Sequence, residues 1–332
     1  MTWSRRQQKK NDFLFAAARA SVRLGLALPR AWLGPIGSSL GIAAYALLGS
    51  ARRAAIDNMA LVHPELEAAR CRAIVRATYR ALGRNLTDTL ALLDPREDPA
   101  RTLSIDAGSE RVLSDALALG RGVIYGTCHL GPWERMAALL AARGFPISTV
   151  ARESYDPRFH ALVYEPMRAR RNVHAIYRGE PRAPFAIVRA LRQGRVLGLL
   201  LDMPGRVATQ GVTWLGLPSR MPPGAARLAL RLKSPVVVGT PAPSASGLQI
   251  RITRLSTDDL EPGARGEAEL AQRLADALSE RIRRLPTHWP WMHPSFDRSA
   301  LATAPCAALE SARDPRAIAR AEPLDSEPQR AS

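Results

Sequence analysis

The sequence predicts an α/β fold in which a layered, mixed and largely parallel sheet is flanked by helices. Two observations lead to this prediction. Short apolar runs bounded by turn-forming residues alternate with amphipathic helical stretches between residues 66 and 284, and strands that alternate with helices are typical of parallel sheets. The 332 residues are also enough to bury one large core, or one domain with appendages.

A basic and apolar segment precedes this region. Residues 1–10 are rich in basic side chains, residues 13–28 are apolar but interrupted by arginines, and residues 31–50 carry no charge. The last stretch is just long enough to span a bilayer, although glycine, proline and serine interrupt it. We expect either one spanning helix with a second interfacial helix, or an amphipathic helical hairpin in one leaflet. A signal peptide has the same order of basic, apolar and small residues.

The remaining segments alternate between helix and strand. Residues 66–93 carry an apolar stripe at helical spacing, and a helix at residues 106–119 leads into an apolar strand at residues 122–125. Further strands are predicted at residues 146–151, 196–201, 235–239 and 248–255, and further helices at residues 156–170, 184–192, 223–232 and 267–284. From about residue 299 the chain lacks apolar periodicity, which predicts a disordered tail. The predicted units are therefore a membrane-associated helical region (1–50), one large domain (51–298) and the tail (299–332).

The chain is strongly basic, with a formal net charge of +17. Such a surface favours nucleic acid, anionic lipid headgroups or phosphorylated substrates. Few aromatic residues and the lack of an RNA-binding or zinc-finger pattern argue against a nucleic-acid partner. Cys71, Cys128 and Cys306 have no pairing spacing, which is typical of a reducing compartment and argues against a signal peptide. His288 and His293 have no cysteine or acidic cluster beside them, so we predict no metal site and no cofactor.

One motif carries most of the chemistry, the sequence YGTCHLGPWE at residues 125–134. His129 follows a buried strand, and Glu134 lies in the first turn of the next helix, where the helix dipole stabilises an ionised carboxylate. We expect Glu134 to accept a hydrogen bond from one imidazole nitrogen, which leaves the other nitrogen free to take a proton from a hydroxyl group. Cys128 would point to the opposite side, so we interpret it as packing rather than as a nucleophile.

The spacing H-x-x-x-x-[DE] after a short strand resembles the signature of the glycerolipid acyltransferase superfamily. Further elements narrow the resemblance to the bacterial lipid A biosynthesis lauroyl/myristoyl acyltransferases, in the same order over roughly residues 20–298. They are the segment Asn58–Glu65, the basic stretch Arg168–Asn172 followed by Arg178, the strand Gly194–Leu201 that leads into Asp202, and the segment Trp289–Phe296. The resemblance implies a glycerolipid acyltransferase-like fold with an N-terminal membrane anchor.

The resemblance also implies an O-acyltransferase on the cytoplasmic side of the cell inner membrane. It would move a fatty acyl chain from a thioester to a hydroxyl group of a lipid A precursor or a related glycolipid. The resemblance favours acyl carrier protein over acyl-coenzyme A as the donor, and an acidic carrier would suit the basic surface.

Two departures from the family pattern concern the acceptor. The acidic element reads Asp202-Met203-Pro204 where the family has D-x-D, and Ser295 stands where the family has an arginine. The alternative is therefore another acceptor, such as a phospholipid, an aminolipid or a glycosylated phosphoinositide. A lipid hydrolase of the same fold and a non-catalytic lipid-binding protein are further alternatives.

The implied reaction assigns roles to further residues. A thioester is a good electrophile, so His129 would activate the acceptor hydroxyl directly, and hydrogen-bond donors must stabilise the oxyanion. Arg152 at a strand end and Arg168 or Arg170 on the following helix are the candidates. Each could equally bind phosphate groups of the substrates or lie on a solvated helix face. Asp202, at the end of a buried strand, would orient a substrate hydroxyl or pair with one of these arginines.

Overall fold

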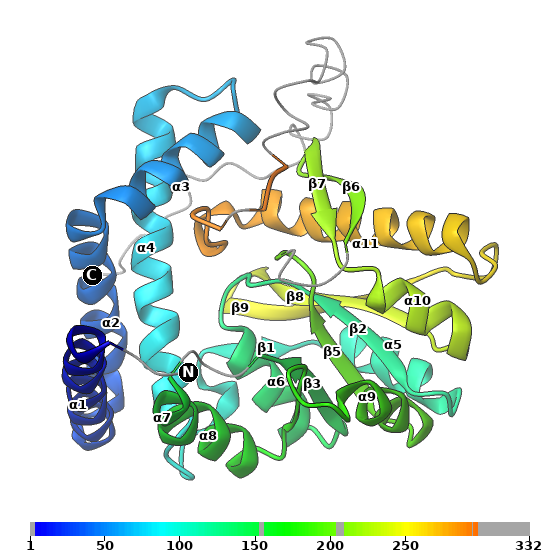
Figure 1. Cartoon of the computed structure of the whole chain (residues 1–332), viewed down its shortest axis with the longest axis horizontal. Helices are drawn as coiled ribbons and strands as arrows, with labels where there is room; N and C mark the ends of the chain where they lie inside the picture. Colours follow the sequence, from blue (N-terminus) through cyan, green and yellow to red (C-terminus); the bar gives the residue numbers. More distant parts are fainter. Residues whose placement is uncertain (1–3, 153–155, 204–208, 294, 298–332) are drawn as a thin grey trace.

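The structure, a computed structural model, describes residues 4–152, 156–203, 209–293 and 295–297 (Figure 1). A seven-stranded sheet in the order β1-β9-β8-β2-β5-β3-β4 forms its centre. Every neighbouring pair is parallel except β8 and β9, which confirms the predicted mixed and largely parallel sheet. The strands are β1 (Leu103–Ile105), β2 (Val123–Thr127), β3 (Ile147–Ala151), β4 (His174–Tyr177), β5 (Val196–Leu200), β8 (Val236–Ser244) and β9 (Gly247–Leu255).

Helices cover both faces of this sheet, because its central strands are apolar on both sides. Ile124, Leu197 and Val236 share one buried cluster with Leu230 and Leu274 of two covering helices. The residues next to them along the strands point to the opposite face and form a second cluster with two other helices. The first face is covered by α9 (Ala183–Arg192), α10 (Gly224–Leu232) and α11 (Ala264–Arg284), and the second by α5 (Ala107–Ala118) and α6 (Trp133–Ala142).

Several elements differ from the predicted pattern. The short strand β1, the edge strand β4 and the separate antiparallel hairpin of β6 (Gln210–Trp214) and β7 (Leu217–Met221) were not predicted, because none contains a long apolar run. Strand β8 continues through Pro241, where it pairs with β9 alone, and proline is tolerated in such a strand. The predicted helix at residues 156–170 is divided into α7 (Pro157–Phe159), a π-helical turn (His160–Tyr164) and α8 (Glu165–Arg170).

The N-terminal part of the chain forms four helices on one side of the sheet (Figure 1). They are α1 (Arg5–Ala27), α2 (Arg30–Leu47), α3 (Gly49–Val62) and α4 (Ala68–Ala91). Helices α2 and α4 meet backbone to backbone: a Cβ atom on Gly41 would lie 2.0 Å from the carbonyl oxygen of Tyr79, so only glycine fits there. Helix α2 is thus docked on the large domain despite its apolar sequence.

No single helix among the described residues is long and apolar enough to cross a bilayer. Helices α2 and α3 together would meet the requirement of length and composition, but they are bent by 92° relative to each other. The predicted membrane anchor stays a prediction. The predicted disordered tail, residues 299–332, lies outside the described residues.

Candidate active site

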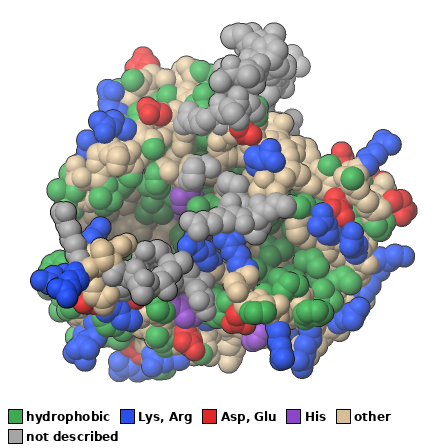
Figure 2. All heavy atoms as spheres, viewed as in Figure 1, with side chains coloured by type: hydrophobic (Ala, Val, Ile, Leu, Met, Phe, Trp, Pro, Cys, Tyr) green, Lys and Arg blue, Asp and Glu red, His purple; other side chains and the backbone are tan. Residues whose placement is uncertain are grey.

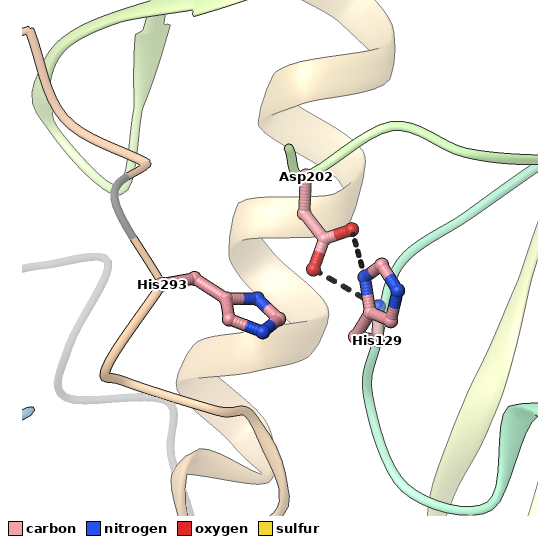
Figure 3. A group of neighbouring side chains, drawn as sticks. All are labelled: His129, Asp202 and His293. Atoms are coloured by element: carbon pink, nitrogen blue, oxygen red, sulfur yellow. Dashed lines mark hydrogen bonds and ion pairs between the residues drawn. The ribbon is translucent and has the colours of Figure 1, made fainter. Parts of the chain in front are cut away.

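The candidate base, His129, lies at the carboxyl edge of the sheet beside Asp202 (Figure 3). The two residues follow β2 and β5, which are adjacent and parallel, and the pairing extends to Leu201, whose N–H donates to Thr127 O at 2.9 Å. The ends of parallel strands meet at one edge, so residues far apart in sequence become neighbours. Asp202 Oδ1 lies 2.8 Å from His129 Nδ1, and Oδ2 accepts the backbone N–H of His129 at 3.0 Å.

Asp202 is buried and held by further hydrogen bonds. The indole N–H of Trp289 donates to Oδ2 at 2.9 Å, and the hydroxyl of Ser295 donates to the backbone carbonyl of Asp202 at 3.0 Å. Burial by itself would raise the pKa of Asp202, but attraction to His129 and the hydrogen bonds from it lower this pKa below its ordinary value. Asp202 is therefore a carboxylate at neutral pH.

The protonation of His129 follows from this contact. Burial would lower the pKa of His129, but the charge and hydrogen bond of Asp202, and then the charge of Glu134, raise it above its ordinary value. A carboxylate at Nδ1 selects the tautomer with its hydrogen on that nitrogen. In the neutral ring Nε2 is then the unprotonated nitrogen, and Figure 3 shows it turned away from Asp202.

The hydrogen-bond partner of Glu134 is not the one that the sequence predicted. It lies in the first turn of α6 as expected, but its carboxylate pairs with the guanidinium of Arg168, whose Nε lies 3.2 Å from Oε2. The predicted hydrogen bond from His129 is taken by Asp202 instead. The physical reason is the turn between them: Gly131 has a φ of +62°, and Pro132 is the N-cap residue of α6, so the Glu134 side chain is directed toward α8. Its catalytic role stays a prediction.

The predicted arginines lie in different environments. Arg168 is partly buried, with its guanidinium bound to Glu134 and stacked 5.5 Å over the ring of Tyr164. Arg170 donates to the backbone carbonyl of Leu93 and so supports the segment after α4. Arg152 is exposed directly after β3, at the same sheet edge as His129. The structure thus brings Arg168 to Glu134, and it brings Arg170 to the backbone of a neighbouring segment.

A second histidine, His293, completes the group in Figure 3. Its ring packs edge-to-face on that of His129, with 5.2 Å between the centroids. Burial lowers the pKa of His293 to about 4, because it outweighs the attraction of Asp202 and is reinforced by repulsion from His129. The ring of His293 is therefore neutral at pH 7. The sequence analysis predicted no metal site at His293 and gave this residue no catalytic role.

The segment that carries His293 is held by a residue that lies near the other end of the domain in sequence. The side-chain amide of Asn58 on α3 donates to the backbone carbonyls of Trp291 at 2.7 Å and His293 at 3.2 Å. Asn58 and His293 belong to two of the four sequence elements that carry the family resemblance. The presence of both residues in elements of one family was the sequence signal that could have suggested a contact between them.

Two neighbours of His129 serve as packing. Trp133 lies edge-on to the imidazole, with 4.9 Å between the ring centroids, and limits its movement. Cys128 is fully buried, and burial followed by the charge of Asp202 raises the pKa of its thiol well above the ordinary value. A thiol that holds its proton so strongly is a poor nucleophile, in agreement with the packing interpretation.

His129, Asp202 and His293 offer ligand atoms that all lie within 4.8 Å of one another, a set of types that suits a transition metal. The Asp202 oxygens, however, already accept hydrogen bonds from two groups of His129 and from Trp289. These bonds by themselves account for the orientation of both side chains. A carboxylate that holds one imidazole nitrogen in this way can orient a histidine for general-base chemistry.

The residue after Glu134 enters a different buried cluster. Arg135 is fully buried and donates to Glu97 Oε1 at 2.7 Å and to the backbone carbonyl of Asp88 at 3.1 Å. Arg101 binds the same two acidic residues, at 2.7 Å and 2.9 Å. We call Asp88, Glu97, Arg101 and Arg135 the ion cluster. It ties the first turn of α6 to the end of α4.

The sequence profile of a family described as bacterial lipid A biosynthesis acyltransferase matches residues 3–298. No curated protein gives a significant match to the chain. The matched range contains every side chain of the site described above.

Proposed function

The chain belongs to the bacterial lipid A biosynthesis acyltransferase family, and on this premise we propose that it transfers a fatty acyl chain from a thioester to a hydroxyl group of a lipid A precursor or a related glycolipid. We assign His129 as the general base and Asp202 as the carboxylate that orients it. The observation that supports this assignment is the hydrogen-bond pattern at the imidazole, in which Asp202 holds Nδ1 and no described residue forms a hydrogen bond to Nε2.

The proposed reaction needs no covalent enzyme intermediate. His129 Nε2 takes the hydroxyl proton as the acceptor oxygen attacks the thioester carbonyl carbon, and the carbonyl oxygen becomes an oxyanion. When the tetrahedral intermediate collapses, the carbon–sulfur bond breaks and the leaving thiolate takes the proton from the imidazolium. Asp202 stabilises the imidazolium between the two proton transfers.

We propose that Glu134 acts through Arg168 rather than on the imidazole. Its carboxylate holds the Arg168 guanidinium, and its charge raises the pKa of His129. A guanidinium fixed in this way suits stabilisation of the oxyanion. Arg152, exposed at the same edge, is assigned to phosphate groups of the donor or acceptor, and Arg170 to support of the site through the segment after α4.

We further propose that α1 and α2 lie in the cytoplasmic leaflet of the inner membrane. They expose the large apolar side chains of Phe13, Leu24, Trp32 and Leu47 near a basic N-terminal end. Such helices bind anionic bilayers without spanning them. In Figure 2 the surface is hollowed between α4, on which α2 packs, and the sheet, and hydrophobic side chains lie along part of the rim, which suits a fatty acyl chain.

The membrane proposal is tested with purified protein and phosphatidylglycerol vesicles. Replacing Trp32 and Leu47 together by serine should strongly reduce flotation with the vesicles, because both side chains are exposed and their loss leaves the α2–α4 contact intact. Unchanged flotation of this variant would contradict the proposed membrane face.

The reaction is tested by mass spectrometry of total lipids, including lipid A, from cells with and without this gene. Loss of one secondary acyl chain from lipid A is the expected result. If lipid A is unchanged but another acylated glycolipid or aminolipid is lost, the base chemistry is kept and the acceptor is a different lipid. This outcome would agree with Pro204 and Ser295, which stand where the family has the second aspartate and the arginine. Unchanged acylation of all lipids would refute the proposed function.

A further inference from the structure

We propose that α9 and the segment before it form the docking surface for an acidic acyl carrier protein. The inference rests on the proposed function, because it concerns the donor of that reaction. The surface, which we call the α9 surface, consists of five exposed side chains: Arg178, Arg182, Phe185, Arg189 and Arg192. One exposed carboxylate, that of Glu180, lies among them, so the surface is strongly positive.

The α9 surface begins at the sheet edge that carries the base. Strands β2, β5, β3 and β4 are parallel, so their carboxyl ends lie at one edge. His129 follows β2 and Arg178 follows β4 at this edge, and α9 starts shortly afterwards at Ala183. In Figure 1, α9 lies at the opposite end of the molecule from α1 and α2. A carrier on α9 would therefore not compete with a membrane on the N-terminal helices.

The arginines of this surface differ from those that the fold uses. In the basic stretch singled out from the sequence, Arg168 binds Glu134, and Arg170 binds the backbone carbonyl of Leu93. Arg178 belongs to the same stretch. Within the described part of the chain, neither it nor the three other arginines of the α9 surface has a carboxylate within ion-pair distance. Unpaired cations grouped on one face attract a partner of opposite charge.

Helix stability accounts for only part of this group. Arg189 and Arg192 lie in the last turn of α9, where a positive charge is favourable to the helix dipole. Arg182, by contrast, is the N-cap residue, where a positive charge opposes the dipole. The positive charge of Arg182 is therefore unfavourable for the isolated helix. Recognition of an anionic partner would explain why an arginine stands at this position.

Phe185 adds an apolar centre to the charged surface. It is 77% exposed, although the opposite side of the same helix buries Ala190 and Leu191. Figure 2 shows hydrophobic side chains over α9 with basic side chains beside them. An exposed aromatic residue ringed by arginines is the composition expected of a protein-binding patch, because aromatic and arginine side chains contribute most to the energy of such interfaces.

The test measures carrier binding directly. An acyl carrier protein with its acyl chain in a stable amide linkage is labelled with a fluorophore and titrated with the full-length protein. We expect the double variant R178E/R182E to raise the Kd at least about tenfold, because it places like charges opposite the acidic carrier. A carboxylate in place of Arg182 is favourable at the helix N-terminus, so folding is preserved. Phe185→Ala should raise the Kd by a smaller factor, and salt should weaken wild-type binding more than binding of the double variant.

The matched control is R111E/R254E, which makes the same change of net charge at exposed arginines on α5 and β9. It should change the Kd less than about threefold, since long-range attraction is screened by salt. Equal weakening by both double variants, unchanged binding by R178E/R182E, or no binding by the wild type would each overturn the proposal. So would loss of flotation with phosphatidylglycerol vesicles by R178E/R182E while carrier binding is kept, because the surface would then be a lipid contact. The variant His129→Ala should bind the carrier as tightly as the wild type. Carrier binding therefore tests the α9 surface independently of whether His129 is the general base.

Discussion

Glu134 and Arg135 are neighbours at the start of α6, yet their side chains enter two buried clusters of different kinds. Arg135 lies in the ion cluster, where each carboxylate meets at least two arginines and backbone carbonyls accept further N–H groups of Arg135. Glu134 and its partner Arg168 lie beside His129, whose Nε2 faces away from its carboxylate partner. The carboxylates of the first cluster bind arginines of the same chain, whereas in the second cluster no described residue forms a hydrogen bond to Nε2 of His129.

The comparison separates structural charges from charges available to a substrate. Burial by itself would raise the pKa of Glu97, and hydrogen bonds from Arg101 and Arg135 lower it below its ordinary value. Asp202 follows the same rule, but its partner is an imidazole that exchanges protons near neutral pH. Substitutions in the site should therefore change the rate more than stability, and substitutions in the ion cluster should do the reverse.

The largest expected effect on activity comes from His129→Gln. Removal of the general base should lower kcat/KM by at least about two orders of magnitude, with little change in the midpoint of thermal unfolding. Steady-state kinetics with a thioester donor, together with a melting curve, measures both. A variant that kept full activity would remove His129 from the mechanism.

Asp202→Asn should have the next largest effect. The amide keeps the shape of the side chain but loses the charge that selects the His129 tautomer and stabilises the imidazolium, so kcat should fall by about two orders of magnitude or more. If Asp202→Asn kept its kcat while Glu134→Gln lost most of its kcat, the assignment of Asp202 would be wrong, because Glu134 would then be the carboxylate that orients His129.

Arg135→Met tests the other cluster. Glu97 would keep Arg101 but lose its bond to a fully buried partner, and we expect the free energy of unfolding to fall by about 3 kcal/mol. Urea denaturation measures the loss. The folded fraction should retain a normal kcat, so a drop in kcat per folded molecule would extend the site into the ion cluster.

Glu134→Gln should reduce kcat about tenfold, because Arg168 loses its partner, with a smaller loss of stability than Arg135→Met. The pH dependence sharpens this prediction. The charge of Glu134 raises the pKa of His129, so its removal lowers that pKa, and the unprotonated base persists to lower pH. The acid limb of the pH–rate profile should shift downward, and an upward shift would contradict the assignment.

The smallest effect concerns His293 and acid stability. Its pKa is about 4 in the folded protein and about 6.5 in the unfolded chain, so the unfolded state binds more protons between these values. Stability should therefore fall as the pH drops from 6.5 toward 4. His293→Gln should lose less stability over this interval than the wild type, as measured by unfolding curves at several pH values. An equal loss would assign the acid sensitivity to other groups.

Local sequence patterns were sufficient for most of the fold. Apolar runs bounded by turn residues predicted the strands β2, β3, β5 and β9, and the stripe at residues 66–93 predicted α4. The strands β1 and β4 escaped prediction because a three-residue strand and an edge strand carry too little apolar pattern to stand out. The hairpin of β6 and β7 is likewise held by contacts rather than by a long apolar run.

The sequence by itself determined the α/β alternation, the position of His129 at a strand end, the position of Glu134 in a helical first turn and, through ordered motifs, the family. These features depend on residues close together in the chain. Only the tertiary structure decided which carboxylate meets the imidazole, because Asp202 reaches His129 through the pairing of β2 with β5. The same holds for Asn58, which reaches the His293 segment from the other end of the domain. Hydrogen-bond partners across parallel strands are set by register and chain crossing, and neither leaves a local pattern in the sequence.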